Sequence, residues 1–265
     1  MHVLMMIGDH PRHRYVARAA VATGLVRAVI VQRREAHVPT CPIHLDAHTQ
    51  KLFELHFAGR ASAEATFFQE KSERLEDIEE LYISRDELNG QLVHDFIRRF
   101  RPGLLLSYGI HKLSEGTLAC VSGVLWNIHG GLSPWYRGAI THFWPSYMLE
   151  PQMTGVTVHE LTQSIDGGAI VHQACAPMVV GDGIHELACR AVCSLADDLP
   201  ELLQRSETGD IRPPRLQRTT GRIWREADWR PEHLRVIYDL YDNRIVDRYL
   251  SGEFSRIEPK LIRQL

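Results

Sequence analysis

The sequence predicts an α/β fold in which an open, mostly parallel twisted sheet is flanked by helices. Residues 2–8 and 26–32 are short apolar runs typical of buried strands, and residues 12–24 between them repeat apolar residues at helical spacing and stop at a glycine. This order is that of a βαβ unit, which implies a parallel sheet. Later apolar runs at 103–109 and 123–129 predict two more buried strands. Together these observations favour a Rossmann-like architecture.

The other elements are predicted from hydrophobic periodicity and capping signals. Residues 46–83 have a mostly helical pattern, which is clearest over 67–83. Ser84 to Glu87 has the form of a capping box and predicts a helix over 88–100. The remaining predicted elements are a short helix at 114–121, a helix at 139–150 broken by Pro145, two strands at 154–161 and 169–177 joined by a polar turn, and a helix of about twenty residues at 183–205.

Two parts of unequal size are expected along the chain. Residues 1–205 form a main domain, and 206–265 form a small C-terminal appendage that begins with a stretch rich in Pro, Gly, Thr and charge. The appendage is too small to count as an independent domain. We expect its aromatic side chains to attach it to the core; stacking on a nucleotide base and packing in a homodimer are the alternatives. These aromatic residues are Trp224, Trp229, Tyr238 and Tyr241.

Composition excludes several classes of protein. Of the 265 residues 44% are hydrophobic and 24% charged, which is ordinary for a globular protein, and a net charge of −3 predicts no nucleic-acid partner. The five cysteines form no CxxC pair, and no apolar run reaches the length of a membrane span, so we expect a cytoplasmic protein that is not bound to membranes. The fifteen histidines include no HExxH motif or close Cys/His set, and we therefore expect no metal site.

Polar side chains follow the strand at 123–129 in an unusual way. Alternation along a strand puts Asn127 and His129 on one face, and ligands of open α/β sheets bind beyond the carboxyl ends of strands. Asp166 follows later in a tight turn. Such a set suits attack of an amine on a carbonyl-type carbon without a metal. A histidine can move a proton, an aspartate can orient the imidazole, and an asparagine amide can donate to the oxyanion that develops. Each residue also has an ordinary structural reading, as a strand cap, a hydrogen-bonded half-buried histidine or an Asx-turn.

The stretches "NIHGGLSPWYRG" and "TGVTVHELTQSIDGGAIVHQ" resemble the folate-dependent formyltransferase family. That family includes glycinamide ribonucleotide, methionyl-tRNA and nucleotide-sugar N-formyltransferases, and this chain looks most like the last of these. The resemblance covers residues 100–175 well and the opening βαβ unit loosely. Gly130-Gly131 stands where the family often has Pro-Ser, and Thr141 where it often has Pro. The matching residues are Asn127, His129, Leu132, Pro134, Tyr136, Arg137, Gly138, Gly155 to His159, Asp166 and Gly168.

The resemblance implies that 10-formyltetrahydrofolate is the donor and a primary amine the acceptor. It implies that Asn127 donates to the oxyanion, that His129 assists the tetrahedral intermediate, and that Asp166 fixes His129 and helps to remove the amine proton. The folate-binding residues implied are Ile110, His111, Lys112, Leu113, Ser164, Ile165 and Gly167. The acceptor-binding residues implied are Gly130, Gly131, Tyr136, Arg137, Gly138 and Thr141.

The choice of acceptor is narrowed because this chain lacks features that particular members of the family carry. The transfer-RNA enzymes carry a C-terminal β-domain with a basic surface, the purine enzyme has Gly-Ser-Asn in place of "RGAIT", and the hydrolase relatives carry an N-terminal regulatory domain. We therefore expect a nucleotide-linked amino sugar as acceptor. Another small-metabolite amine, hydrolysis of 10-formyltetrahydrofolate and a non-catalytic binding protein of the same fold remain the alternatives.

Overall fold

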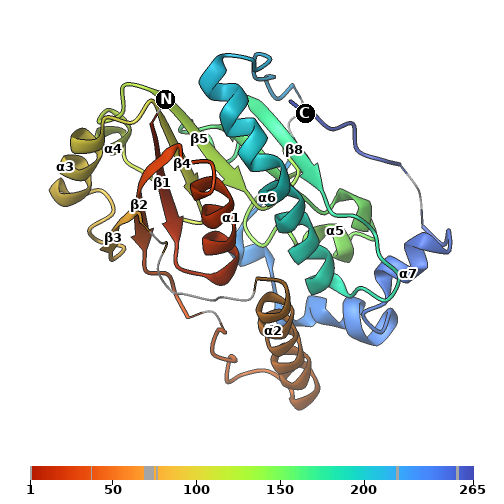
Figure 1. The fold of residues 1–265 in the computed structure, drawn as a ribbon. Helices are drawn as coiled ribbons and strands as arrows, with labels where there is room; N and C mark the ends of the chain where they lie inside the picture. Colours follow the sequence, from red (N-terminus) through yellow and green to blue (C-terminus); the bar gives the residue numbers. More distant parts are fainter. Residues whose placement is uncertain (1, 37, 69–74, 76, 219–220, 255–256) are drawn as a thin grey trace.

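A seven-stranded sheet forms the centre of the computed structural model of this protein (Figure 1). Its strands are β1 (Val3–Gly8), β2 (Val26–Gln32), β3 (Glu79–Ile83), β4 (Leu104–Tyr108), β5 (Val124–His129), β7 (Gly155–Glu160) and β8 (Ile170–Cys175). Their order across the sheet is β3-β2-β1-β4-β5-β7-β8. The first five strands in this order pair in parallel, and β7 pairs antiparallel with both β5 and β8. The predicted open, mostly parallel sheet is confirmed. The structure describes the chain except residues 1, 37, 69–74, 76, 219–220 and 255–256.

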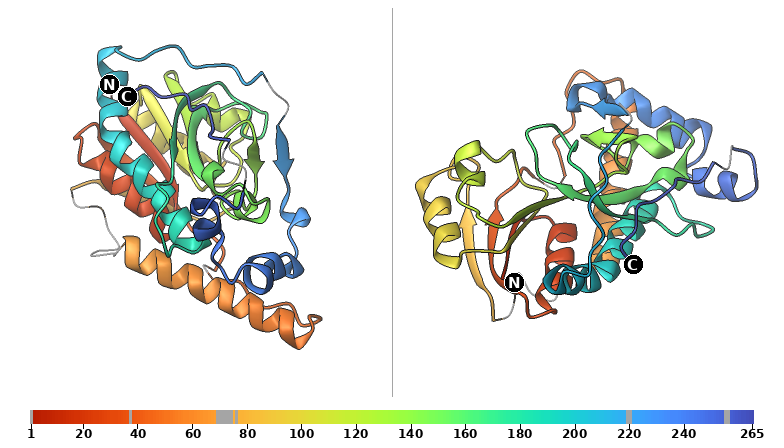
Figure 2. Two further views of the ribbon diagram at one scale, coloured as in Figure 1. Left: turned by 90° about the vertical axis from the view of Figure 1, so that its right-hand side faces the viewer. Right: turned by 90° about the horizontal axis from the view of Figure 1, so that it is seen from above.

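Helices cover both faces of the sheet because the buried strands send apolar side chains to both (Figure 2). In β1, Met5 and Ile7 pack in one cluster with the helices α1 and α6, whereas Leu4 and Met6 pack on the opposite face with α3. The helix α2 also packs against α1 and α6. The main helices are α1 (Pro11–Val21), α2 (Ala47–Phe68), α3 (Gln91–Phe100), α4 (Glu115–Leu118) and α6 (Ile184–Thr208). Within the described residues, no helix is both long and apolar enough to span a bilayer.

The prediction of a helix over 67–83 is wrong. The helix α2 ends at Phe68, and Glu79–Ile83 forms β3 at the edge of the sheet; residues 69–74 and 76 lie outside the described residues. In this strand only Ile83 is buried. A charged edge strand lacks the apolar run by which a strand is recognised, and its charges are consistent with a solvated helix face as well.

Three further helices are shorter than predicted, among them α4, which spans Glu115–Leu118 where 114–121 was expected. Ser84 and Glu87 do form the reciprocal bonds of a capping box, but these bonds close a turn, and α3 begins only at Gln91. The helix predicted over 139–150 is a single turn, α5 (Trp144–Tyr147), with Pro145 inside its first turn. A proline fits best in the first turn of a helix, which agrees with a helix that begins at Trp144, although α6 contains Pro200 in its interior.

The described residues of the C-terminal segment, which follows α6, pack against earlier parts of the chain. Its strand β9 (Arg222–Trp224) pairs in parallel with β6 (Tyr136–Gly138), and Trp224 stacks on Trp144 with 4.2 Å between ring centroids. Further along, Trp229 packs against aromatic rings of α2. The segment also contains short helices at Glu226–Asp228, Pro231–His233 and Val236–Leu240, and the helix α7 (Ile245–Leu250).

Candidate active site

The end of β5 is where the polar side chains of the sequence motif meet. Asn127 lies opposite His159 of β7 in the sheet register, and His129 lies opposite Thr157. The connection between β7 and β8 brings Asp166 to the same place: its Oδ2 is 3.3 Å from His129 Nδ1 and its Oδ1 is 3.4 Å from His159 Nε2. The structure therefore gathers the three predicted catalytic side chains, with His159 as a fourth.

Asp166 is held in an ionised, strained and largely buried position. It has a φ of 43°, which is rare outside glycine, and Oδ2 accepts a 2.8 Å hydrogen bond from Gly138 N–H. Burial on its own raises the pKa of this carboxyl group. The charge of His129, the hydrogen bond from His159 and the Gly138 amide outweigh burial and lower the pKa to about 2.

His129 lies between two hydrogen-bond acceptors. Its Nε2 is 2.8 Å from the carbonyl oxygen of Tyr136, and Nδ1 faces Asp166. Only the protonated imidazole can donate to both. Burial opposes that form and lowers the pKa of His129, while Asp166 and the Tyr136 carbonyl partly restore it. An imidazolium that forms during a reaction therefore finds two acceptors ready.

Asn127 has its amide orientation fixed by its neighbours. Ser107, directly opposite in β4, donates a 2.8 Å hydrogen bond to Asn127 Oδ1, so Nδ2 is the donor end. Nδ2 lies 3.2 Å from His159 Nε2, the ring nitrogen that also faces Asp166 Oδ1. An amide nitrogen carries two hydrogens, and one of them is available to an oxygen in the cleft.

Two cavities open on these residues. The larger has a volume of about 540 Å³ and the smaller about 240 Å³, and both are lined by Ile110, Asn127 and Asp166. A combined space of this size matches small-molecule sites in proteins. The predicted residues that line the smaller cavity are Ile110, His111, Lys112, Leu113, Ser164 and Ile165. Those that line the larger are Gly130, Gly138 and Thr141.

Side chains from other elements hold the backbone of residues 110–113, which lines the smaller cavity. Gln32 accepts from His111 N–H through its Oε1 at 2.9 Å, and Asn89 donates to the carbonyl of Lys112 at 3.1 Å. Residues 110–113 lie outside the helices and strands, so their backbone is not committed to the sheet. A backbone edge of this kind fits the donor and acceptor pattern of a pterin.

Four predicted ligand-binding residues do not line either cavity. Tyr136 is buried among apolar residues and its hydroxyl donates to Glu150 at 2.5 Å, and Arg137 lies next to it on β6. Gly131 and Gly167 allow close packing: a Cβ on Gly131 would contact the Tyr136 carbonyl, and one on Gly167 would contact Ser164 Oγ. In the turn that holds Asp166 the left-handed φ lies at Asp166 and not at Gly167, so the glycine is required for space and not for its φ.

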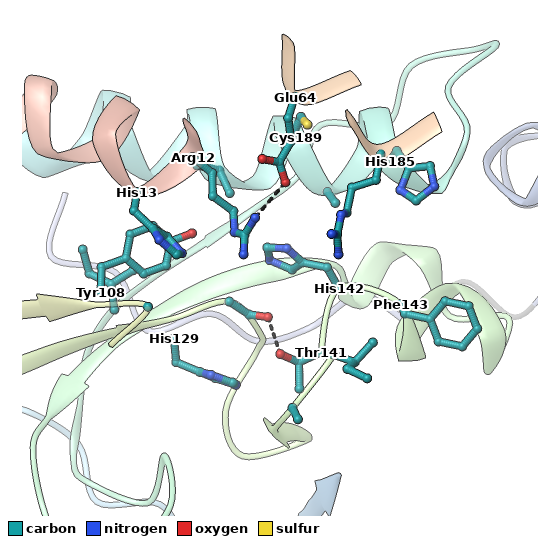
Figure 3. A pocket seen from close by; sticks show the side chains of 18 of the residues that line it. Arg12, His13, Glu64, Tyr108, His129, Thr141, His142, Phe143, His185 and Cys189 are labelled. Atoms are coloured by element: carbon teal, nitrogen blue, oxygen red, sulfur yellow. Dashed lines mark hydrogen bonds and ion pairs between the residues drawn. The ribbon is translucent and has the colours of Figure 1, made fainter. Parts of the chain in front are cut away.

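Several residues of the site were not predicted from the sequence. Ser107 and His159 are two of them; His159 belongs to the "GVTVH" block, and its place opposite Asn127 follows only from the strand pairing. The others form the far wall of the larger cavity, where side chains from α1, α2 and α6 converge (Figure 3). These are Arg12, His13, His56, Arg60, Glu64 and His185. Across the described part of the chain, no three His, Cys, Asp or Glu side chains are grouped so that they could hold a metal ion.

The chain is similar in sequence to a known formyltransferase. A methionyl-tRNA formyltransferase from Gloeothece citriformis is 33% identical over 111 residues, which are 42% of this chain. The match spans only 31% of that relative.

Solved structures agree in fold. A sugar N-formyltransferase from a Shewanella species (17% identity, TM-score 0.55) is matched over 86% of this chain and 78% of its own. A phosphoribosylglycinamide formyltransferase from Anaplasma phagocytophilum is 18% identical with a TM-score of 0.57, and the match covers 80% of this chain and 89% of that one. An N-formyltransferase from Helicobacter canadensis, in complex with folinic acid and dTDP-3-aminofucose, is 16% identical with a TM-score of 0.53. The match covers 87% of this chain and 73% of that one.

The family assignment rests on the sequence match and agrees with these folds. The model of the formyl transferase family matches residues 26–194, which include β5, the "GVTVH" strand and Asp166. Because this match spans more than half of the chain, the protein belongs to the formyl transferase family.

Proposed function

We propose that this protein transfers the formyl group of 10-formyltetrahydrofolate to a primary amine, and that the amine belongs to a nucleotide-linked amino sugar. The observation that supports this best is the position of Asn127 and Asp166 at the junction of two cavities. A donor in the smaller cavity and an acceptor in the larger one would meet at these side chains. Solved relatives include a sugar N-formyltransferase and an N-formyltransferase in complex with dTDP-3-aminofucose, which favours the amino-sugar class.

The donor fits the smaller cavity chemically. We place the pterin between the backbone of residues 110–113 and the turn at 164–166, with its formyl-bearing nitrogen toward Asp166. The amine then enters from the larger cavity. This arrangement holds the two reactants in one orientation, which converts a bimolecular encounter into a step within one complex.

The chemistry proposed needs one oxyanion donor and one path for a proton. As the amine nitrogen bonds to the formyl carbon, the carbonyl oxygen becomes negative and accepts from the free Nδ2 hydrogen of Asn127. The amine releases a proton to the pair formed by His129 and Asp166, whose carboxylate stabilises the imidazolium. When the bond from the carbon to the folate nitrogen breaks, that nitrogen takes the proton and tetrahydrofolate leaves.

A panel of nucleotide-linked amino sugars, incubated with the protein and 10-formyltetrahydrofolate, tests the proposal. Mass spectrometry should show the gain of one formyl group on at least one amine, together with release of tetrahydrofolate. Consumption of the donor with release of formate in the absence of any amine would instead identify a hydrolase. Binding of a folate analogue without consumption in any mixture would identify a non-catalytic relative.

A further inference from the structure

The ring of His129 faces a backbone carbonyl with one nitrogen and a carboxylate with the other. It lies on the side of the larger cavity away from α1 and α6 (Figure 3). Nε2 is 2.8 Å from the carbonyl oxygen of Tyr136 in β6, and Nδ1 is 3.3 Å from Asp166 Oδ2. A neutral imidazole has a single N–H, so one of the two nitrogens meets its oxygen without a hydrogen between them. The position of that hydrogen decides which nitrogen can accept a proton.

The two distances favour a hydrogen on Nε2. Hydrogen bonds from N–H to oxygen in proteins span about 2.7 to 3.2 Å, so the contact with the Tyr136 carbonyl fits a hydrogen bond and would be repulsive without the hydrogen. The 3.3 Å contact with Asp166 lies just outside that range. This carboxylate also has other donors, because Oδ2 accepts from Gly138 N–H at 2.8 Å and Oδ1 faces His159.

The Tyr136 carbonyl is held beside His129 by the packing of β6. The Tyr136 amide donates to the carbonyl of Leu132 at 2.8 Å, and the Tyr136 hydroxyl donates to Glu150 at 2.5 Å. β6 pairs along its length with β9, and the rings of Tyr136 and Trp224 are parallel, with 6.3 Å between their centroids. The backbone and the side chain of Tyr136 are both fixed, so its carbonyl oxygen has a defined position.

Gly131 leaves the space in which this contact forms. A Cβ at Gly131 would lie 2.5 Å from the Tyr136 carbonyl oxygen, 2.6 Å from His129 Nε2 and 2.8 Å from Thr141 Cβ. Distances this short would force the carbonyl and the imidazole apart. The φ of Gly131 is not in the left-handed region, so an alanine can adopt its backbone conformation. This position therefore requires the absence of a side chain and not the conformational freedom of glycine.

The ionisable groups around His129 come from β6, β7 and the loops next to them. Burial lowers the pKa of His129, Asp166 and the hydrogen bond with the Tyr136 carbonyl raise it, and the charges of His159 and Arg137 lower it. His142 lies near enough for the charge of His129 to lower its pKa in turn. The Tyr136 carbonyl acts at Nε2, so a variant that loses this contact should have a lower pKa at His129.

We propose that the Tyr136 carbonyl keeps a hydrogen on Nε2 of His129 throughout formyl transfer, and that Gly131 is the positioning residue that makes this possible. This inference rests on the proposed function and adds the route of its proton. An N–H bond of the amine breaks as a bond forms from that hydrogen to Nδ1, beside Asp166, and the same proton later moves from Nδ1 to the folate nitrogen. The opposite tautomer could accept a proton only at Nε2, which the buried Tyr136 carbonyl obstructs.

Nitrogen NMR of the protein labelled in its histidines tests the inference without any turnover. The protonated and unprotonated nitrogens of a neutral imidazole give separate signals, and comparison with His129→Gln identifies those of His129. At a pH where this ring is neutral, we expect the hydrogen on Nε2 in the parent protein. Both tautomers should appear in Gly131→Ala, because the carbonyl is displaced. A parent protein with the hydrogen on Nδ1, or a Gly131→Ala protein that keeps it wholly on Nε2, overturns the inference.

The kinetics of formyl transfer give a second readout. Gly131→Ala should lower kcat by about tenfold and leave KM for the folate donor nearly unchanged, because the wrong tautomer still allows binding but cannot take the proton. The acid limb of the profile of kcat against pH should move to lower pH, because the imidazolium loses an acceptor. A Gly131→Ala protein with a lower melting temperature but the kcat and pH profile of the parent would show a purely structural role and contradict the inference.

Gly123→Ala is the matched control. Its Cβ would also lie against a backbone carbonyl, that of Gly103, but next to the first residue of β5, at the opposite end of that strand from His129. It should change neither the tautomer of His129 nor the pH profile of kcat.

Failure of this inference and failure of the proposed function give different results. Formyl transfer by a parent protein whose His129 carries its hydrogen on Nδ1 would remove the role of the Tyr136 carbonyl and leave the transferase. A hydrogen on Nε2 that Gly131→Ala releases, in a protein that never consumes 10-formyltetrahydrofolate, would do the reverse.

Discussion

Gln217 and Asp166 connect the C-terminal segment to the candidate active site. Gln217 Nε2 donates to the backbone carbonyl of Asp166 at 2.8 Å and to that of Gly168 at 2.7 Å. Ser133 Oγ donates a further hydrogen bond to the backbone carbonyl of Asp166. The strained turn that presents the carboxylate is therefore held in place by residues distant in sequence, one of them in the segment that follows α6.

Gln217→Ala should lower kcat by about tenfold with little change in the melting temperature. The variant removes two hydrogen bonds worth about 1 kcal/mol each from a turn with a left-handed φ, so Asp166 samples other positions relative to His129. Steady-state kinetics and thermal unfolding measure the two quantities. Gln50→Ala, on the exposed side of α2, is the control. Unchanged kcat in Gln217→Ala would show that the C-terminal segment has no part in positioning Asp166.

His129→Ala and Asp166→Asn should each reduce kcat by about a hundredfold or more while the fold persists. The reason is that the imidazole moves the proton and the carboxylate stabilises its charged form. The double variant should be little worse than either single one, since residues that act as a unit are not additive. Single-turnover experiments measure the rate of formyl transfer in the parent protein, the two single variants and the double variant. Near-normal turnover in Asp166→Asn would contradict the assignment.

Ser107→Ala should lower kcat with almost no effect on KM. Without the Ser107 hydroxyl, the Asn127 amide loses the hydrogen bond that holds Oδ1 away from the cleft and Nδ2 toward it. A flipped amide would present its oxygen to the developing oxyanion, which destabilises the transition state. We expect a loss of about tenfold, less than for Asn127→Ala, because the amide is still present. Ser146→Ala, also fully buried but not in either cavity, is the control for packing. Equal kinetics in the Ser107 and Ser146 variants would remove Ser107 from the site.

The sequence predicts the parts of the site that lie close together along the chain. Asn127 and His129 are two residues apart on one strand, and the turn with Asp166 has a recognisable motif, so all three could be found without coordinates. The bond between Ser107 and Asn127 depends on strand pairing, which no local pattern encodes. The same holds for Arg12 and Arg60, which are brought to one cavity only by the packing of α1, α2 and α6.

The errors in the predicted fold have a similar cause. Periodicity identifies elements with a buried face, and the central strands β1, β2 and β4 are predicted well because nearly every residue in them is buried. The edge strand β3 has one buried residue and no such signal. The strand β9 exists only because three residues pair with β6, and a strand of that length has no period to detect.

The stability of the protein should fall as the pH drops from about 6.5 toward 4, in part through His185. Burial, then the charge of Arg60, lowers the pKa of His185 from 6.5 to about 4 in the folded state. Between these values the unfolded chain binds more protons, so stability rises with pH there and the contribution of His185 is complete above about 6.5. His185→Gln should therefore flatten the curve of unfolding free energy against pH, by at most about 1.4 kcal/mol per pH unit.

Urea unfolding at several pH values measures this effect. His44→Gln, at an exposed position, should leave the curve of the parent protein unchanged. A His185→Gln protein with the full pH dependence of the parent would show that His185 does not titrate in this window.

Gly167→Ala and Gly130→Ala should separate the two cavities. A Cβ on Gly167 would clash with Ser164 Oγ and displace the turn that lines the smaller cavity, whereas a Cβ on Gly130 would lie 3.2 Å from His142 Cε1 in the larger one. We expect Gly167→Ala to weaken binding of a folate analogue severalfold and to leave binding of the acceptor unchanged. Gly130→Ala should instead weaken binding of the acceptor and leave folate binding unchanged, because it displaces the His142 ring in the larger cavity. Calorimetry with a folate analogue and with a nucleotide-linked amino sugar measures both affinities. Should Gly167→Ala leave folate affinity intact, the pterin lies elsewhere, and the division of the cleft into a donor and an acceptor side is wrong.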